Sequence, residues 1–182
     1  MQTINRPQPK TIDFTDLFDR LLHHRDSQAD CSHLGTLGPW LHRQLSTNIL
    51  PDLPHLPFKS GTYTRTYVSK ESSDEPCHMP IDPLFEALVM RWDEQSKTSI
   101  HGHPKFSFYH VMSGVFEIEL FDQSAAGNLH HKESQQLMPT DSTWFSGNSR
   151  CYDNCIHRVT CLEPGLTFHV YSDNALKGAI FE

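Results

Sequence analysis

The apolar residues in the first quarter of the chain recur at helical spacing. The first stripe begins after Asp13 and Thr15, two residues typical of a helix cap. It consists of Leu17, Leu21 and Leu22. A second stripe consists of Leu37, Trp40, Leu41 and Leu45. Both stripes predict amphipathic helices within residues 13–45, and we expect them to be packing faces rather than part of a cofactor site.

A different pattern, rich in β-branched and alternating residues, begins at residue 62. A link containing Pro51, Pro54 and Pro57 separates it from the helical region. The segments that read as strands are residues 62–68, 85–92, 107–111, 115–121 and 166–171. Turn signals occur at Ser113-Gly114, Ala126-Gly127-Asn128, Ser146-Gly147-Asn148 and Pro164-Gly165. We expect the polar residues 70–83 to form a loop.

Helices followed by many short strands predict a mainly β fold of the α+β class. Short strands with regular turns are typical of a sandwich or a barrel. A chain of 182 residues is long enough for one domain with its own core. We therefore expect a single domain over residues 1–182, in which a helical segment of about residues 1–58 packs on a β-barrel of about residues 60–182.

The charge pattern argues against two classes of partner. The formal net charge is −7 and no basic run is present, so neither nucleic acid nor an anionic membrane is an expected partner.

Apolar stretches such as residues 85–90 are too short to span a bilayer. Residues 1–10 contain no signal-peptide core. We expect a cytoplasmic monomer.

The cysteines read as reduced thiols. The chain has five of them, Cys31, Cys77, Cys151, Cys155 and Cys161, and an odd number without a signal peptide argues against a disulfide framework. The C-x3-C spacing of Cys151 and Cys155 could indicate zinc, but no second pair follows at zinc-site spacing. We expect the last three cysteines to be buried and unreactive, with oxidation sensing as the alternative.

The strongest candidate chemistry lies at His101-Gly102-His103. In an extended strand both imidazoles point to the same side, where they can bind one metal ion. His157, in a later strand-like segment, is the best third ligand. No acid follows His103 directly, which favours a neutral set of three histidines over a set that includes a carboxylate. Imidazoles bind zinc, copper, iron and nickel alike, so the residues alone leave the metal open.

Four short blocks, in the same order along the chain, resemble the cysteine dioxygenase family of cupins. They are Tyr63-Thr64-Arg65, Trp92 with Ser99-Ile100-His101-Gly102-His103, Ile156-His157-Arg158-Val159, and Thr167-Phe168-His169-Val170-Tyr171-Ser172. The resemblance covers roughly residues 63–172. It implies a cupin fold, which is a double-stranded β-helix or jelly-roll barrel, behind the N-terminal helices. It also implies Fe(II) as cofactor and a small thiol and O2 as substrates.

The family's metal and substrate roles carry over onto matching positions. His101, His103 and His157 match the three iron ligands. Arg65 matches the arginine that pairs with the substrate carboxylate, and its planar guanidinium can hold a carboxylate by two hydrogen bonds. Tyr63 matches an aromatic residue that lines the pocket.

The same resemblance assigns a proton relay. Tyr171 matches the tyrosine whose hydroxyl reaches the substrate and oxygen, and His169 and Thr167 match the residues that hydrogen-bond back to it. These three residues alternate by two, so one strand aims them all to the same side. Trp92 matches a second aromatic residue of the pocket lining.

The chain departs from the family pattern at two places. In the animal enzymes a cysteine five positions beyond the second ligand crosslinks to the active-site tyrosine. That position is Phe108 here, so no thioether to Tyr171 can form there. Bacterial relatives also lack this cysteine, so we expect a bacterial-type site in which Phe108 makes the pocket tighter and drier. Asp173-Asn174 replaces a Pro-Pro pair, which leaves the shape of the loop at residues 173–178 open.

The resemblance implies an Fe(II)- and O2-dependent thiol dioxygenase. Because arginine at the position of Arg65 goes with cysteine in this family, we expect conversion of L-cysteine to cysteine sulfinate. One alternative is another small thiol, such as 3-mercaptopropionate, cysteamine or a specialised metabolite. An alternative of another class is a non-catalytic metal-binding cupin that acts as a sensor or storage module. The relay that ends at Tyr171 argues against this last function, because a sensor has no need of a proton-sharing tyrosine.

Overall fold

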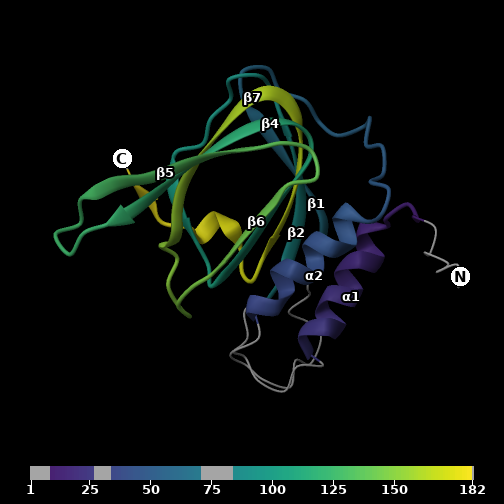
Figure 1. Ribbon diagram of the computed structural model, residues 1–182, viewed down its shortest axis with the longest axis horizontal. Coiled ribbons are helices and arrows are strands. Elements are labelled where there is room, and N and C mark those ends of the chain that lie inside the picture. The colour runs from purple at the N-terminus through teal and green to yellow at the C-terminus, as the bar shows by residue number, and fades with distance from the viewer. Residues whose placement is uncertain (1–8, 27–33, 71–83, 182) are drawn as a thin grey trace, which may run out of the picture.

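The order of elements is the predicted one, helices first and strands afterwards (Figure 1). The structure, a computed structural model, describes residues 9–26, 34–70 and 84–181. The helices are α1 (Phe14–Asp26) and α2 (Leu34–Ser46). The strands are β1 (Tyr63–Lys70), β2 (Glu86–Trp92), β3 (Ile100–His103), β4 (Phe106–Gln123), β5 (Leu129–Leu137), β6 (Ser142–Ser146), β7 (Asn154–Tyr171) and β8 (Ile180–Phe181). A 3-10 turn, η2 (Ala175–Lys177), precedes β8.

Two long antiparallel strands, β4 and β7, organise the barrel. They pair from Ser107 opposite Tyr171 to Leu120 opposite His157. In one half of the barrel, β6 pairs with β4, while β2 pairs with β7 and β1 with β2. In the other half, β5 pairs with β4, while β3 pairs with β7 and β8 with β3. The two halves share β4 and β7 and curve towards each other, as Figure 1 shows.

Both long strands bend at glycines where the sequence predicted turns. Gly114 has a φ of +84°, and the pairing of β4 with β7 shifts register around it. A Cβ added to Gly114 would lie 2.6 Å from the carbonyl oxygen of Glu163, and one added to Gly165 would lie 2.7 Å from the Cα of Gly114. The predicted turns at Ser113-Gly114 and Pro164-Gly165 are therefore wrong. The glycines let two continuous strands bend against each other at close range.

Three strands were missed by the sequence pattern: β5, β6 and β8. The side chains of β5 are polar and mostly exposed on both of its faces, so no alternation marks it. The predicted turns at residues 126–128 and 146–148 are confirmed, because they lie between β4 and β5 and between β6 and β7. The predicted loop at residues 70–83 lies outside the described residues except for Lys70, which ends β1, and Cys31 and Cys77 also lie outside them.

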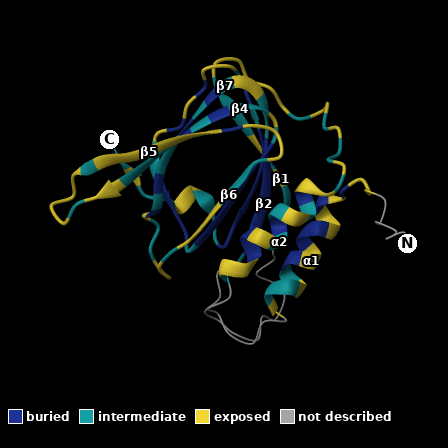
Figure 2. Ribbon diagram, viewed as in Figure 1, coloured by how far each residue is buried: buried dark blue, intermediate teal, exposed yellow. Residues whose placement is uncertain are grey.

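The two helices pack on the outer face of the half-barrel that contains β2 (Figure 2). The Oδ1 of Asp13 accepts hydrogen bonds from the N–H groups of Thr15 at 2.8 Å and Asp16 at 3.2 Å, so the predicted cap of α1 is confirmed. The buried leucines of the two stripes are Leu17, Leu21, Leu37, Leu41 and Leu45. They share one core with the outward-facing residues Ala87, Val89, Phe106, Phe108, Phe168 and Val170. Both stripes are therefore packing faces, as predicted.

Alternate residues of the same strands face into the barrel and form a second core. Its members include Leu88, Met90, Trp92, Tyr109, Val111, Phe116, Ile118 and Tyr171. The predicted fold class, a mainly β barrel behind N-terminal helices, is confirmed. Within the described residues, no helix has the length and apolar character needed to cross a membrane.

His110 links stability to pH. It is fully buried on β4, and its Nδ1 lies 2.7 Å from the hydroxyl oxygen of Ser142, which is also 3.0 Å from the Nδ1 of His42 on α2. Burial, and then the nearby His42, lower the pKa of His110 to about 4. The unfolded chain therefore binds more protons than the folded one between pH 6.5 and 4, so stability falls as the pH drops through this window.

We expect His110→Asn to reduce that slope of unfolding free energy against pH, by up to about 1 kcal/mol per pH unit. Urea unfolding between pH 7 and pH 4 measures it. The control is His130→Asn at an exposed position on β5. Equal slopes in the wild type and His110→Asn would show that this histidine does not titrate differently on folding.

Candidate metal centre

Three histidines from two neighbouring strands meet on the inner face of the barrel. His101 and His103 lie on β3, and His157 lies on β7 directly opposite His101. One ligand nitrogen from each histidine lies within 4.8 Å of the others. The expected convergence of the three side chains is confirmed, and their binding of a metal stays a prediction.

The backbone orients two of the three rings. The Nδ1 of His101 lies 2.9 Å from the carbonyl oxygen of Ser99, and the Nδ1 of His157 lies 3.1 Å from that of Cys155. A carbonyl only accepts, so each Nδ1 carries the proton and each Nε2 keeps a lone pair. The Nε2 atoms of His103 and His157 are 3.3 Å apart, a separation that fits two ligands each about 2.0–2.1 Å from one cation. The donor set therefore fits a divalent metal ion.

Burial keeps the three rings neutral. It is the largest cause that lowers the pKa of His101, takes the pKa of His157 to about 3, and holds that of His103 well below its usual range. A metal binds the neutral imidazole, so all three rings are in the binding form at pH 7. Among the described residues no carboxylate or thiolate joins this group, in agreement with the expected neutral set. Such a set does not select one transition metal.

A hydrogen-bonded chain reaches the histidines along the inner face of β7. The indole N–H of Trp92 donates to the Oγ1 of Thr167 at 2.8 Å, and this oxygen lies 2.7 Å from the Nε2 of His169. The Nδ1 of His169 lies 2.9 Å from the hydroxyl oxygen of Tyr171. The ring of Tyr171 stacks on His103, with centroids 5.1 Å apart and planes at 3°. The structure thus brings the predicted relay to the predicted ligands, and Trp92, expected to line the pocket, anchors the far end of the relay.

The indole of Trp92 can only donate a hydrogen bond, and this limits the directions that the hydrogen bonds between Trp92 and Tyr171 can take. Trp92 can only donate, so Thr167 accepts from it. The buried Thr167 hydroxyl lies 2.7 Å from the Nε2 of His169 and close enough to Tyr109 to lower its pKa, and the chain runs towards Tyr171 in the arrangement in which Thr167 donates to Nε2. His169 must then carry its own proton on Nδ1 and donate to Tyr171, because burial, followed by the charge of Arg65, holds the pKa of His169 well below its usual range. The proton of Tyr171, whose pKa burial raises, is left free to point away from His169.

Arg65 and Tyr63 lie at the β1 edge of the barrel. The Cζ of Arg65 is 5.4 Å from the centroid of the Tyr63 ring, which is itself 4.5 Å from the ring of Trp92. Arg65 is exposed, yet its charge affects the pKa of His101, His103, His169 and Tyr171. An accessible guanidinium therefore lies close to both the histidines and the relay.

The residue opposite Tyr171 is Ser107, one position before the expected Phe108. The register pairs Ser107 with Tyr171 and Phe108 with Val170. Successive side chains of a strand point to opposite faces. Phe108 contributes to the cavity lining, but it belongs to the helix-side core together with Val170. The residue that faces Tyr171 is therefore a serine, which cannot form a thioether to it either. Only the pairing register could have identified Ser107 as the facing residue.

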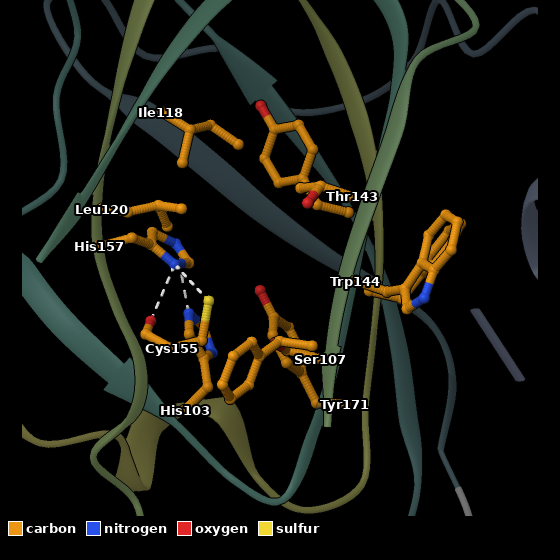
Figure 3. A pocket seen from close by; sticks show the side chains of 12 residues that line it. His103, Ser107, Ile118, Leu120, Thr143, Trp144, Cys155, His157 and Tyr171 are labelled. Atoms are coloured by element: carbon orange, nitrogen blue, oxygen red, sulfur yellow. Dashed lines mark hydrogen bonds between the residues drawn. The ribbon is translucent and has the colours of Figure 1, made fainter. Parts of the chain in front are cut away.

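A cavity of about 30 Å³ adjoins His103, His157 and Tyr171 (Figure 3). Cys155 also lines it, with its sulfur 3.6 Å from the Nδ1 of His157. Burial raises the pKa of Cys155 to about 12 and, as the largest cause, that of Cys161 to about 11. Of the three cysteines expected to be buried, only Cys161 is, and Cys151 and Cys155 are half-buried. The high thiol pKa values of Cys155 and Cys161 favour the unreactive interpretation of these two cysteines.

The loop after β7 supports the strand that carries two of the histidines. The hydroxyl of Tyr152 donates to the carboxylate of Asp173 at 2.5 Å. The N–H of Gly102 donates to the carbonyl of Ala179 at 2.7 Å, and β8 pairs with β3 across His101. The segment whose shape the sequence left open therefore leads into Ala179 and β8, which fix β3 at the edge of the sheet.

Comparison with known proteins adds a likeness to cupin structures. No family model matches the chain, and no curated protein matches it significantly. A cupin superfamily protein from Desulfitobacterium hafniense is 12% identical, with a TM-score of 0.47 over 68% of this chain and 92% of that chain. An RmlC-like cupin from Shewanella frigidimarina is 15% identical (TM-score 0.41, 66% and 91%), and KdgF from Halomonas sp. is 20% identical (TM-score 0.42, 65% and 85%). Likenesses at this level carry no argument about the function of this chain.

His157→Ala should weaken Fe(II) binding by about 100-fold or more, because two neutral imidazoles remain where three converged. Anaerobic titration with Fe(II), followed by calorimetry, measures the affinity. The matched control is His130→Ala, which removes an exposed imidazole from β5. Unchanged affinity in His157→Ala would contradict the ligand assignment.

Proposed function

We propose that this protein is an Fe(II)- and O2-dependent thiol dioxygenase that converts L-cysteine to cysteine sulfinate. The observation that carries the proposal is the chain from Trp92 to Tyr171, which ends on a phenol stacked against one of three convergent histidines. A site that only stores or senses a metal has no use for a hydroxyl whose proton is directed in this way.

The chain's residues would hold the metal without neutralising it. His101, His103 and His157 are uncharged at pH 7, so a bound cation keeps its full charge for anionic ligands. Iron(II) held there would supply the chemistry of thiolate and O2 binding. The remaining groups orient the substrate and hold a proton.

Arg65 is suited to bind the carboxylate of the amino acid. Its exposed position at the β1 edge lets an anion reach it, and its effects on the pKa of His169 and Tyr171 support a position near the relay. A carboxylate held by Arg65 and by the proton of Tyr171 would be fixed at two points. Two fixed points restrict rotation of the thiol end, which is the main contribution that positioning makes to rate.

Tyr171 would hold a proton rather than release one. Burial raises the pKa of its phenol, and in the tautomer in which the Nδ1 of His169 donates to it, its own O–H is free to donate to the substrate. Thr167 and Trp92 act only through this bond, as positioning residues. The proposal thus makes Tyr171 the proton donor and the other three side chains of the hydrogen-bonded chain its positioning residues.

Arg65→Gln should raise the KM for cysteine by about 10–100-fold, because an ion pair with the carboxylate is replaced by weaker hydrogen bonds. Cysteamine lacks the carboxylate, so its turnover should change little. Oxygen uptake by the Fe(II)-loaded protein with both thiols measures this, and Arg43→Gln, at an exposed position on α2, is the control. Equal losses with both thiols would remove the carboxylate role.

Thr167→Val should lower kcat for cysteine by about tenfold with a smaller effect on KM, because it breaks the chain that orients the proton of Tyr171. Thr167→Ser, which keeps the hydroxyl, should restore activity. Thr160→Val changes the same residue type on the same strand, outside the relay, and is the matched control. Failure of Thr167→Ser to recover activity, or an equal loss in Thr160→Val, would indicate packing rather than positioning.

A further inference from the structure

The cavity beside the histidines lies on the β6 side of the site. Its lining comes from β3, β4, β6 and β7, and no residue of β1 or β2 contributes to it. Thr143, Trp144 and Phe145 of β6 form one wall of the cavity, and Figure 3 shows that the side chain of Trp144 points away from the histidines and Tyr171. Trp144 and Phe145 are 38% and 40% exposed, so this wall reaches the protein surface. We call this space the β6-side cavity.

Charge separates the β6-side cavity from the Arg65 side. The guanidinium lies on β1, the strand at the other edge of the same half-barrel from β6. The cavity lining contains no Asp, Glu, Lys or Arg. The site therefore has a charged side and an uncharged side.

Most of the surface that lines the cavity is apolar, and its polar atoms belong to the two histidines and to residues such as Ser107, Thr143 and Tyr171. Tyr109 borders the cavity, and its hydroxyl is buried with no partner at hydrogen-bond geometry among the described residues. Burial is the largest cause that raises the pKa of Tyr109, and Tyr171, Cys161 and Thr167 also affect it. Ile118 and Leu120 contribute hydrocarbon from β4. A mostly apolar lining suits an apolar gas.

Size points to the same class of ligand. The cavity volume of about 30 Å³ corresponds to about two water-sized molecules, which is too small for an amino acid but sufficient for a diatomic gas. The cavity reaches His103 and His157 directly, so a molecule held there would lie against the candidate ligands.

We propose that the β6-side cavity binds O2 and delivers it to the metal centre, separately from the thiol, which arrives on the Arg65 side. This inference rests on the proposed dioxygenase function. It adds a second route into the site and makes Ile118 and Thr143 determinants of the affinity for O2.

Krypton, an apolar gas, tests the cavity without any catalysis. Crystals of the wild-type protein pressurised with krypton should show an anomalous peak in the β6-side cavity, and crystals of Ile118→Phe, which fills it, should not. Ordered water in the cavity, or krypton only beside Arg65, would overturn the proposal.

Kinetics test the role of the gas site. In the Fe(II)-loaded protein, Ile118→Phe should raise the KM for O2 by about fivefold or more and leave the KM for cysteine within about twofold. Thr143→Leu, on the partly exposed β6, should also raise the KM for O2. It provides a second test if Ile118→Phe does not fold. Ile49→Phe, at a residue 54% exposed and remote from the cavity, is the matched control.

The outcomes separate this inference from the function on which it rests. Equal changes in the two KM values, or a change for cysteine alone, would overturn the separate route while leaving the dioxygenase intact. Absence of O2 uptake with every thiol would remove both, and the krypton result would then describe an apolar cavity with no role in catalysis.

Discussion

The pairing of β4 with β7 across two glycine bends is the constraint on which the site depends. His157 and Tyr171 lie on the same strand, 14 residues apart, and a straight strand of that length spans about 45 Å. Yet the ring centroids of both lie within 5.1 Å of that of His103. Only the bend at Gly165, matched by Gly114 on β4, folds the strand so that one sequence segment supplies both a candidate ligand and the relay.

Burial then decides the electrostatics of everything that the bend brings together. It lowers the pKa of each histidine and raises that of Tyr171, so the interior holds neutral bases and a protonated phenol. The charge of the exposed Arg65 acts on them from the β1 edge, and that of Glu86 on β2 acts on Tyr171. A metal ion held by neutral ligands with a cation nearby favours anionic substrates. A thiolate that also carries a carboxylate meets this requirement better than a neutral molecule does.

Much of this arrangement was predictable from the sequence. The helical stripes, the cap at Asp13 and the alternation of Thr167, His169 and Tyr171 are local patterns, and each appears in the structure as the pattern indicated. The convergence of His157 with His101 is not local. The strand-like segment around His157 indicated it, the resemblance supported it, and the register places the two residues opposite each other.

What the sequence could not predict depends on pairing between distant segments. Gly114 and Gly165 read as turns because glycine marks both turns and bends, and only the partner strand distinguishes them. Ser107 lies opposite Tyr171 because of the strand register. Counting five positions along the chain from His103 gave Phe108, which is one residue too far. The donation from Trp92 to Thr167 joins residues 75 positions apart and leaves no mark in either segment.

The most direct measurement of the central claim follows the oxygen atoms. The Fe(II)-loaded protein would be supplied with L-cysteine and isotopically labelled O2, and the product analysed by mass spectrometry. The account predicts cysteine sulfinate in which both sulfinate oxygens carry the label. Cystine, or sulfinate with oxygen from water, would contradict it, because the site would then oxidise the thiol without transferring O2 to sulfur.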